Sequence, residues 1–295
     1  MERRVLITGA NGQLGLAINK VIQERKDLNI TIINTGRGEA SAYCPITLDI
    51  TNPVAVMNLV QNLQPEIIIN CSAFTAVDLC ESEKERAYRI NAIGAKNLAV
   101  AANDFDAKLV HVSTDFVFDG ENNRPYTEED TPNPISVYGS TKLEGERLVK
   151  EHCVKHFIVR TAWLYGKGKN FVRTMIRLMD EKKDIRVVND QYGCPTSAME
   201  LAKAIVSLMD TEEYGTYHGV CDGGATWYEF AVEIFKQLGV DVKVTPIETS
   251  EYPTPAKRPS YSILSNDKLK KLGIRFKPWR EALKEYILDE GNLRF

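Results

Sequence analysis

The sequence predicts an α/β fold, in which a doubly wound, mostly parallel sheet is followed by a smaller C-terminal α/β part. Two observations support this prediction. In the first half of the chain, short runs rich in β-branched residues alternate with amphipathic helical patterns, which is typical of βαβ units with helices on both faces of the sheet. After about residue 165 this alternation loosens and the segments become less regular.

The elements of the first half follow from periodicity and end signals. An apolar stripe that starts at Leu14 predicts the first helix. Asn52-Pro53, a capping residue followed by proline, predicts the start of the second. A third helix is expected over about residues 83–102 and a fourth from near Tyr138. The strands expected between them are Val5–Thr8, Ile30–Asn34, Ile46–Leu48, Ile67–Asn70, Leu109–Ser113 and Phe157–Arg160.

The second half predicts fewer strands. The segment 252–259 contains three prolines, so it cannot be regular structure, and we expect an exposed loop that has a function. The helices expected around it are 170–181, 197–209, 227–238 and 279–288, with short strands near 185–188 and 242–246.

Composition excludes several classes of function. The formal net charge of −3 provides no basic field, so neither nucleic acid nor an anionic membrane is an expected partner. No apolar run approaches the roughly 20 residues of a membrane span. The N-terminus runs directly into a strand pattern without a signal peptide, so a cytoplasmic location is expected. Neither the cysteines nor the histidines show a metal-ligand spacing, and no metal is expected.

A glycine-rich turn, Thr8–Gly15, joins the first strand to the first helix with GxxGxxG spacing. Glycines there let the backbone approach a pyrophosphate, and the free amides at the helix start bind it. This context predicts a dinucleotide site in a Rossmann-type sheet. The second strand ends in Asn34-Thr35-Gly36-Arg37, which lacks the carboxylate that would bind a ribose 2′-hydroxyl. Arg37 suits a 2′-phosphate, so NADPH is favoured over NADH.

Candidate acid–base residues occur in the fourth helix. Tyr138 and Lys142 form a YxxxK pair, which places both side chains on one helix face. We expect the lysine ammonium to lower the pKa of the tyrosine, which can then protonate a carbonyl oxygen as hydride arrives at its carbon. Thr114, at the end of the preceding strand, is favoured over Ser113 as the hydroxyl that holds the same oxygen.

Nearly the whole chain resembles the dTDP-4-dehydrorhamnose reductases, which belong to the extended short-chain dehydrogenase/reductase superfamily. The last two of the following segments are the most specific to these reductases. The resemblance rests on Ile7–Gly15, Asp49–Thr51, Asn70–Asp78, Ile90–Ala92, Ser113–Gly120, Tyr138–Glu146, Arg160–Gly166, Asn170–Val172, Asp190–Thr196 and Ala256–Pro259.

The resemblance implies reduction of the C4 keto group of dTDP-4-dehydro-6-deoxy-L-mannose to give dTDP-L-rhamnose, with NADPH or NADH as hydride donor. It implies catalysis by Thr114, Tyr138 and Lys142. The cofactor residues would be Gly9, Asn11, Gly12, Gln13, Leu14, Arg37, Asp49, Ile50, Cys71, Ser72, Ala73, Tyr138 and Lys142. The substrate residues would be Thr75, Val77, Thr114, Asp115, Trp163, Asn170, Gln191 and Arg258.

The expected organisation is an NADP(H)-binding Rossmann domain over residues 1–165 and a mainly substrate-binding part over 166–295, which can return segments to the first domain. The chain is expected to act as a monomer or homodimer. Two alternatives stay open at this point: reduction of another nucleotide-linked 4-keto-deoxysugar, and a non-catalytic, NADP-binding regulatory subunit. Consumption of NADPH with a 4-keto-deoxysugar nucleotide would distinguish an enzyme from a regulatory subunit.

Overall fold

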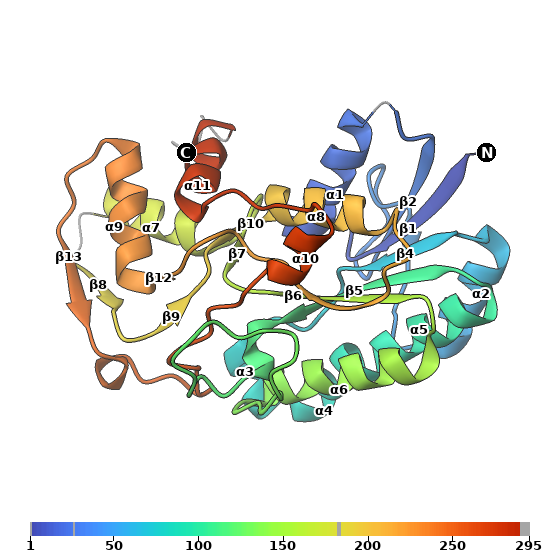
Figure 1. Cartoon of the computed structure of the whole chain (residues 1–295), viewed down its shortest axis with the longest axis horizontal. Helices are drawn as coiled ribbons and strands as arrows, with labels where there is room; N and C mark the ends of the chain where they lie inside the picture. The colour runs from blue at the N-terminus through green and yellow to red at the C-terminus, as the bar shows by residue number, and fades with distance from the viewer. Residues whose placement is uncertain (1, 26, 182–183, 290–295) are drawn as a thin grey trace.

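The computed structural model describes residues 2–25, 27–181 and 184–289 (Figure 1). Its helices are α1 (Gln13–Glu24), α2 (Pro53–Leu63), α3 (Val77–Ser82), α4 (Lys84–Tyr88), α5 (Gly94–Asp104), α6 (Val137–His152), α7 (Phe171–Asp180), α8 (Ala198–Leu208), α9 (Trp227–Leu238), α10 (Asp267–Lys271) and α11 (Trp279–Asp289). A π-helical turn, Arg89–Ile93, joins α4 to α5, and 3-10 turns cover Asp115–Val117 and Thr249–Glu251.

The strands form one large sheet and three short pairs. The large sheet has the order β11-β6-β5-β4-β1-β2-β3, and all of its pairings are parallel. Its members are β1 (Arg3–Thr8), β2 (Ile30–Gly36), β3 (Ile46–Thr47), β4 (Ile67–Asn70), β5 (Lys108–Thr114), β6 (His156–Thr161) and β11 (Gly215–His218). The short pairs are formed by β7 (Leu164–Tyr165) with β10 (Thr196–Ser197), β8 (Ile185–Val188) with β13 (Val244–Ile247), and β9 (Tyr192–Gly193) with β12 (Ala225–Thr226).

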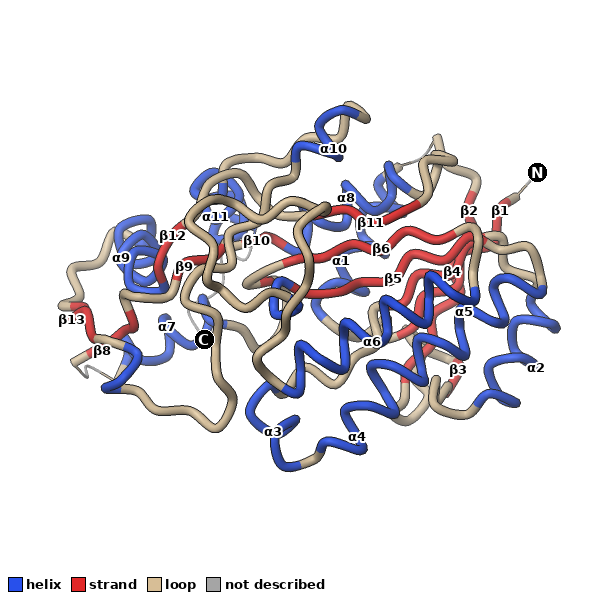
Figure 2. The backbone as a smooth tube through the Cα atoms, turned by 60° about the horizontal axis from the view of Figure 1, so that its bottom comes forward, coloured by secondary structure: helices blue, strands red, loops and turns tan. Residues whose placement is uncertain are grey.

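Two helical layers cover the large sheet, one on each face (Figure 2). Alternate residues of β1 enter different cores: Val5 and Ile7 pack with α1 and α8, whereas Leu6 packs with α2 and α5. This alternation is what a strand covered on both faces requires. The strand order reverses direction at β1, because β2 pairs on one side of it and β4 on the other. Ligands of such sheets bind beyond the carboxyl ends of the strands at this switch point.

The second half of the chain builds a smaller part and then returns to the sheet. Helices α7 and α9 lie with the β8–β13 pair beyond the end of the large sheet (Figure 1). Between these segments, α8 packs against α1 and β11 adds a parallel strand beside β6. The chain therefore crosses between the two parts more than once, and the surfaces between them line the cleft described below.

The predicted fold class is confirmed, and so are the six strands expected in the first half. The helix expected over residues 83–102 is confirmed, and it contains a π-helical turn, Arg89–Ile93, between α4 and α5 that periodicity did not predict. The segment 252–259 is irregular as expected, but it is not simply exposed: Tyr252 is exposed, whereas Ala256 and Pro259 are buried. Strand β11 is absent from the sequence-based prediction.

Candidate active site

A cleft of about 830 Å³ is lined by residues that follow β1, β4, β5 and β6, together with residues from the smaller part. Every residue predicted to bind or catalyse lines it except Gln191. Those brought together are Gly9, Asn11, Gly12, Gln13, Leu14, Arg37, Asp49, Ile50, Cys71, Ser72, Ala73, Thr75, Val77, Thr114, Asp115, Tyr138, Lys142, Trp163, Asn170 and Arg258.

The glycine turn leaves room for an anion at the start of α1. Gly9 has φ +64°, and a Cβ there would lie 3.0 Å from the backbone of Cys71. A Cβ on Gly15 would come within 2.6 Å of the Ala10 backbone, so this glycine lets α1 pack closely on the turn. Gly12 caps α1 without a side-chain acceptor, so the first amides of the helix remain available to a ligand. These features fit a dinucleotide diphosphate.

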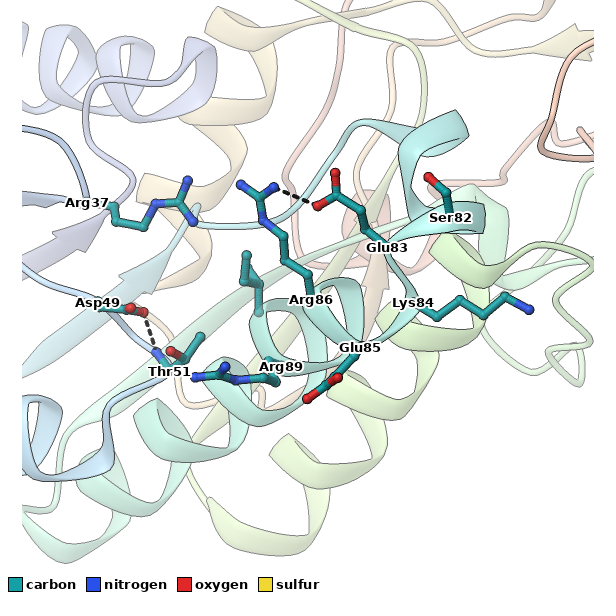
Figure 3. Close-up of a pocket in the computed structure, with 10 residues that line it drawn as sticks. Arg37, Asp49, Thr51, Ser82, Glu83, Lys84, Glu85, Arg86 and Arg89 are labelled. Atoms are coloured by element: carbon teal, nitrogen blue, oxygen red, sulfur yellow. Dashed lines mark hydrogen bonds and ion pairs between the residues drawn. The ribbon is translucent and has the colours of Figure 1, made fainter.

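A second cavity, of about 570 Å³, adjoins the cleft and shares Arg37, Asp49 and Ile90 with it. Figure 3 shows the Arg37 guanidinium reaching across this cavity toward that of Arg86. Asn34 is engaged elsewhere, because its side chain and that of Asn19 donate to each other at 2.8 and 3.0 Å. The side chain that reaches the cavity from the second strand is therefore a cation, which suits an added phosphate.

Asp49 has a local structural task at the edge of this cavity. Its carboxylate accepts a hydrogen bond from the Thr51 backbone at 2.9 Å. This bond is the main cause that holds the pKa of Asp49 below its usual value, and Arg37 and Arg89 add to the effect. The positive charges of Arg37 and Arg89 therefore face the negative charge of Asp49 at this cavity.

The side chains of Thr114 and Tyr138 lie close to each other in the lining of the cleft. The Thr114 hydroxyl donates to Asp115 Oδ1 at 3.0 Å and also lies within hydrogen-bond reach of the Tyr138 hydroxyl. The Tyr138 ring packs edge-on against Phe116 with 5.5 Å between ring centroids. The Ser113 hydroxyl instead donates to Glu146 at 2.6 Å, beside the buried Arg160. The preference for Thr114 over Ser113 agrees with this division.

Burial governs the ionisation of Tyr138 and Lys142. It raises the pKa of the phenol, although the Thr114 hydrogen bond opposes this, and it lowers the pKa of Lys142 to about 8. The expectation that the tyrosine pKa is lowered is wrong for this structure, because burial outweighs the contacts that favour the phenolate. Lys142 donates to the Val112 carbonyl at 2.6 Å and loses its proton before the phenol does.

Asp115 is buried beside this pair. Ser262 donates to its Oδ2 at 2.6 Å, and Thr114 donates to its Oδ1. Burial nevertheless dominates and raises the pKa of Asp115 to about 6. A carboxyl group close to the Tyr138 hydroxyl therefore titrates near neutral pH.

Two tryptophans form the wall of the cleft on the side of the smaller part. Trp163 and Trp227 stack with 3.5 Å between centroids and 8° between planes. Trp163 has φ 44°, which is unusual for a bulky residue, and its indole lies where a Cβ on Gly193 would come within 2.3 Å. Trp227 was missed from the sequence, because it occurs at the first position of α9 and helical periodicity gives no sign of its contact with Trp163.

Arg258 is fixed in place by a residue that the sequence reasoning did not single out. Its guanidinium donates to both carboxylate oxygens of Asp78, at 3.0 and 2.9 Å, and to the Ala256 carbonyl at 2.9 Å. The arginine lowers the pKa of Asp78. This bidentate pair joins the proline-rich segment to the first turn of α3, so Arg258 is an oriented cation at the cleft rather than a freely solvated one.

Asn170 and Gln191 have different positions. Asn170 caps α7 and donates to the Gly166 carbonyl at 2.6 Å, so it lines the cleft while it shapes the loop before the helix. Gln191 does not line the cleft. It is buried, and its amide donates to Thr249 at 3.0 Å. The specific-looking segment around Gln191 thus stabilises the smaller part, and a direct substrate contact by Gln191 is not what the structure shows.

Within the described residues, no group of three or more His, Cys, Asp or Glu side chains is arranged to hold a metal ion. In the same part of the chain, no helix combines the length and apolar character needed to cross a bilayer.

Comparisons with known proteins agree with one another. The family described as RmlD substrate binding domain matches residues 3–291. A dTDP-4-dehydrorhamnose reductase of Escherichia coli is 37% identical over 96% of each chain. Two crystal structures of proteins with the same name are similar over nearly their full length. That of Clostridium acetobutylicum is 49% identical, with TM-score 0.91, over 99% of this chain and 100% of that one. That of Bacillus anthracis, in complex with NADP, is 44% identical, with TM-score 0.89, over 98% and 100%.

Proposed function

Because the chain belongs to the RmlD substrate-binding-domain family, whose dTDP-4-dehydrorhamnose reductases match it from end to end, we propose that it is one of these NADPH-dependent oxidoreductases. The reaction is reduction of the C4 keto group of dTDP-4-dehydro-6-deoxy-L-mannose to dTDP-L-rhamnose. The observation that carries this proposal is that the hydroxyl side chains of Thr114 and Tyr138 lie close to each other in the lining of the cleft.

The chain's own groups manage the proton and the position of the keto oxygen. Bound NADPH supplies the hydride. Thr114 and Tyr138 hold the C4 oxygen between their hydroxyl groups, and Tyr138 donates its proton to that oxygen. At neutral pH Lys142 still carries most of its positive charge, since its pKa is about 8, and this charge stabilises the phenolate that forms. The surrounding burial keeps water away from the proton in transit.

The remaining cleft residues bind the two ligands. The amides of Gln13 and Leu14 hold the cofactor diphosphate, Arg37 binds the 2′-phosphate, and the backbone after β4 lines the ribose side. Arg258 binds the diphosphate of the nucleotide sugar, and Trp163 contacts the sugar. Residues 1–165 supply the cofactor site and several sugar-site residues, and residues 166–295 form a mainly substrate-binding part that returns α8 and β11 to the first part.

The substrate partner of the proposed enzyme is a nucleotide sugar, and NADH is a second, weaker hydride donor. We place the enzyme in the cytoplasm, where its cofactor is abundant. It acts as a monomer or a homodimer, which sedimentation velocity at micromolar concentration distinguishes.

The test is absorbance at 340 nm during turnover. The protein is mixed with NADPH and a 4-keto sugar made in place from dTDP-glucose by a dehydratase and an epimerase. Oxidation of NADPH only when the epimerase is present supports the proposal. Oxidation without the epimerase would assign a different deoxysugar. Bound NADPH with no oxidation under any condition would contradict an enzymatic role and favour a regulatory subunit.

A further inference from the structure

A chain of buried polar side chains runs beneath the cleft to Lys142. The Thr8 hydroxyl donates to Asn70 Oδ1 at 2.7 Å, and Asn70 Nδ2 lies 3.0 Å from His111 Nδ1. His111 Nε2 in turn lies 3.5 Å from Lys142 Nζ. All four side chains are at least 98% buried, so water does not compete for these contacts. This series of contacts joins β1, β4 and β5 to α6 and ends at Lys142 in the lining of the cleft.

The backbone fixes the direction of this chain. The Ser72 amide, which can only donate, bonds to Asn70 Oδ1 at 3.1 Å. Asn70 must therefore point its amide oxygen at Ser72 and its amide nitrogen at His111. His111 Nδ1 then has to accept, so the neutral ring has its proton on Nε2, and that N–H faces Lys142. Protonation of Nδ1 is opposed as well, since burial and Lys142 hold the pKa of His111 well below its usual value.

The two forms of Lys142 meet this N–H differently. An ammonium has three donors and no acceptor, so one face of it would meet the His111 N–H without forming a bond. A neutral amine can donate to the Val112 carbonyl and accept from His111 with its lone pair. The histidine thus adds a preference for the amine that burial alone does not supply.

The other ionisable groups around Lys142 do not reproduce this directional effect. On α6, Glu146 favours the ammonium, but Arg160 of β6 and Ser113 of β5 bond to both of its oxygens. Cys71, after β4, is a neutral thiol at working pH, because burial raises its pKa to about 12. Tyr138, on α6, also stays neutral through this range.

We propose that His111 is a positioning residue that, held by Thr8 and Asn70, presents its Nε2–H to Lys142, favours the amine and so sets the alkaline limit of the reduction. The catalytic consequence rests on the proposed function, since it is the Lys142 ammonium that stabilises the Tyr138 phenolate. The hydrogen-bonded series from Thr8 to Lys142 does not rest on the proposed function, because the direction of its hydrogen bonds is a property of the folded protein without substrate.

The test reads the two protonation states directly by NMR in the ligand-free protein. Histidine labelled with ¹⁵N reports the His111 tautomer, and lysine labelled with ¹³C at Cε reports the titration of Lys142, which the Lys142→Met variant assigns. Two variants form a matched pair. Asn70→Asp offers His111 an acceptor, which reverses the chain. His111→Gln preserves its direction, because a glutamine oxygen can accept from Asn70 while its amide faces Lys142.

We expect the Nε2–H tautomer in the wild type and the Nδ1–H tautomer in Asn70→Asp, where the Lys142 midpoint rises by about one pH unit or more, a tenfold gain in proton affinity. In His111→Gln the midpoint stays within about half a unit of the wild type. An Nδ1–H tautomer in the wild type, or a Lys142 midpoint that Asn70→Asp leaves unchanged, would overturn the proposal. Neither measurement uses turnover. Failure of the proposed reaction would therefore leave the NMR result valid, and failure of the NMR test would leave the proposed reaction untouched.

Discussion

At the scale of single residues, Asp115 shows how burial changes a carboxyl group. Its raised pKa of about 6 means that the folded protein keeps the proton at pH values where the unfolded chain has lost it. Between about pH 4 and pH 6 the folded state therefore binds more protons, and the free energy of unfolding falls as pH rises. Asp115 costs stability at neutral pH, which suggests that its position serves the site.

Asp115→Asn removes this pH dependence. We expect the free energy of unfolding of the variant, minus that of the wild type, to rise by about 2–3 kcal/mol between pH 4 and pH 7. Urea denaturation at a series of pH values measures it. Asp130→Asn is the control that stays flat over this range, because Arg124 lowers the pKa of Asp130 and confines its pH-dependent stability to values below about pH 4. A pH-independent difference for Asp115→Asn would contradict the assignment.

Arg258 provides a second test at the same scale. Arg258→Lys keeps the charge but cannot form the planar double contact with Asp78. We expect the KM for the nucleotide sugar to rise about 10- to 100-fold, equivalent to one or two charge-assisted hydrogen bonds, with a smaller change in kcat. Steady-state kinetics measure the KM. Lys257 is an exposed neighbour of Arg258, and Lys257→Ala is the control, whose KM should change little. An unchanged KM would remove Arg258 from the diphosphate site.

Most individual site residues could be predicted because short motifs bring them together locally. The glycine turn and the YxxxK pair place their members by helix and turn geometry alone. Asp78 and Trp227 could not be found this way, since their functions depend on partners 180 and 64 residues away in the chain, Arg258 and Trp163. Gln191 differs from these residues, because it lies in a segment that carries the family resemblance, yet its side chain bonds to Thr249 and does not line the cleft.

At the scale of elements, the long helix predicted near residues 83–102 contains a π-helical turn between α4 and α5. The extra residue in the turn brings Asn91 inward, where its Oδ1 accepts from the Phe74 amide at 2.8 Å and its Nδ2 donates to Thr141 at 3.1 Å. The turn therefore ties the cleft loop after β4 to α6, which contains Tyr138 and Lys142. Such turns are frequent at functional sites.

Asn91→Ala tests this role. Loss of these buried hydrogen bonds leaves the Phe74 amide without its side-chain acceptor, and we expect the free energy of unfolding to fall by about 2–3 kcal/mol. Chemical denaturation measures the change. Asn97→Ala, on α5, is the matched control, because the Asn97 side chain donates to the Ile50 carbonyl. Its replacement should lower the free energy of unfolding by about 1 kcal/mol. Equal losses in the two variants would contradict a special role for the turn.

Periodicity identified the long elements and missed those defined by distant partners. Strand β11 is only Gly215–His218, and it is a strand because β6 offers it a parallel edge. The two-residue strands of the smaller part have the same origin. A four-residue run with glycine and histidine at its ends contains no alternation from which a strand can be predicted.

At the scale of the whole molecule, the parallel sheet supplies a rigid floor and the smaller part supplies a wall. The cleft lies where the strand order reverses, and residues from both halves of the sequence line it. Returning α8 and β11 to the sheet couples the two parts, because their buried apolar residues belong to the same core as α1 and β1. The relative position of cofactor and sugar is therefore set by one packed unit.

The central claim is that Tyr138 protonates the keto oxygen. The most direct test is the rate of NADPH oxidation by Tyr138→Phe with saturating 4-keto sugar nucleotide, beside a fluorescence titration of NADPH binding. Tyr165→Phe is the matched control, because that buried hydroxyl makes no hydrogen bond within the described part of the chain. We predict a loss of at least about 100-fold for Tyr138→Phe with NADPH still bound, and near-normal rates for the control. Near-normal turnover by Tyr138→Phe would contradict the account.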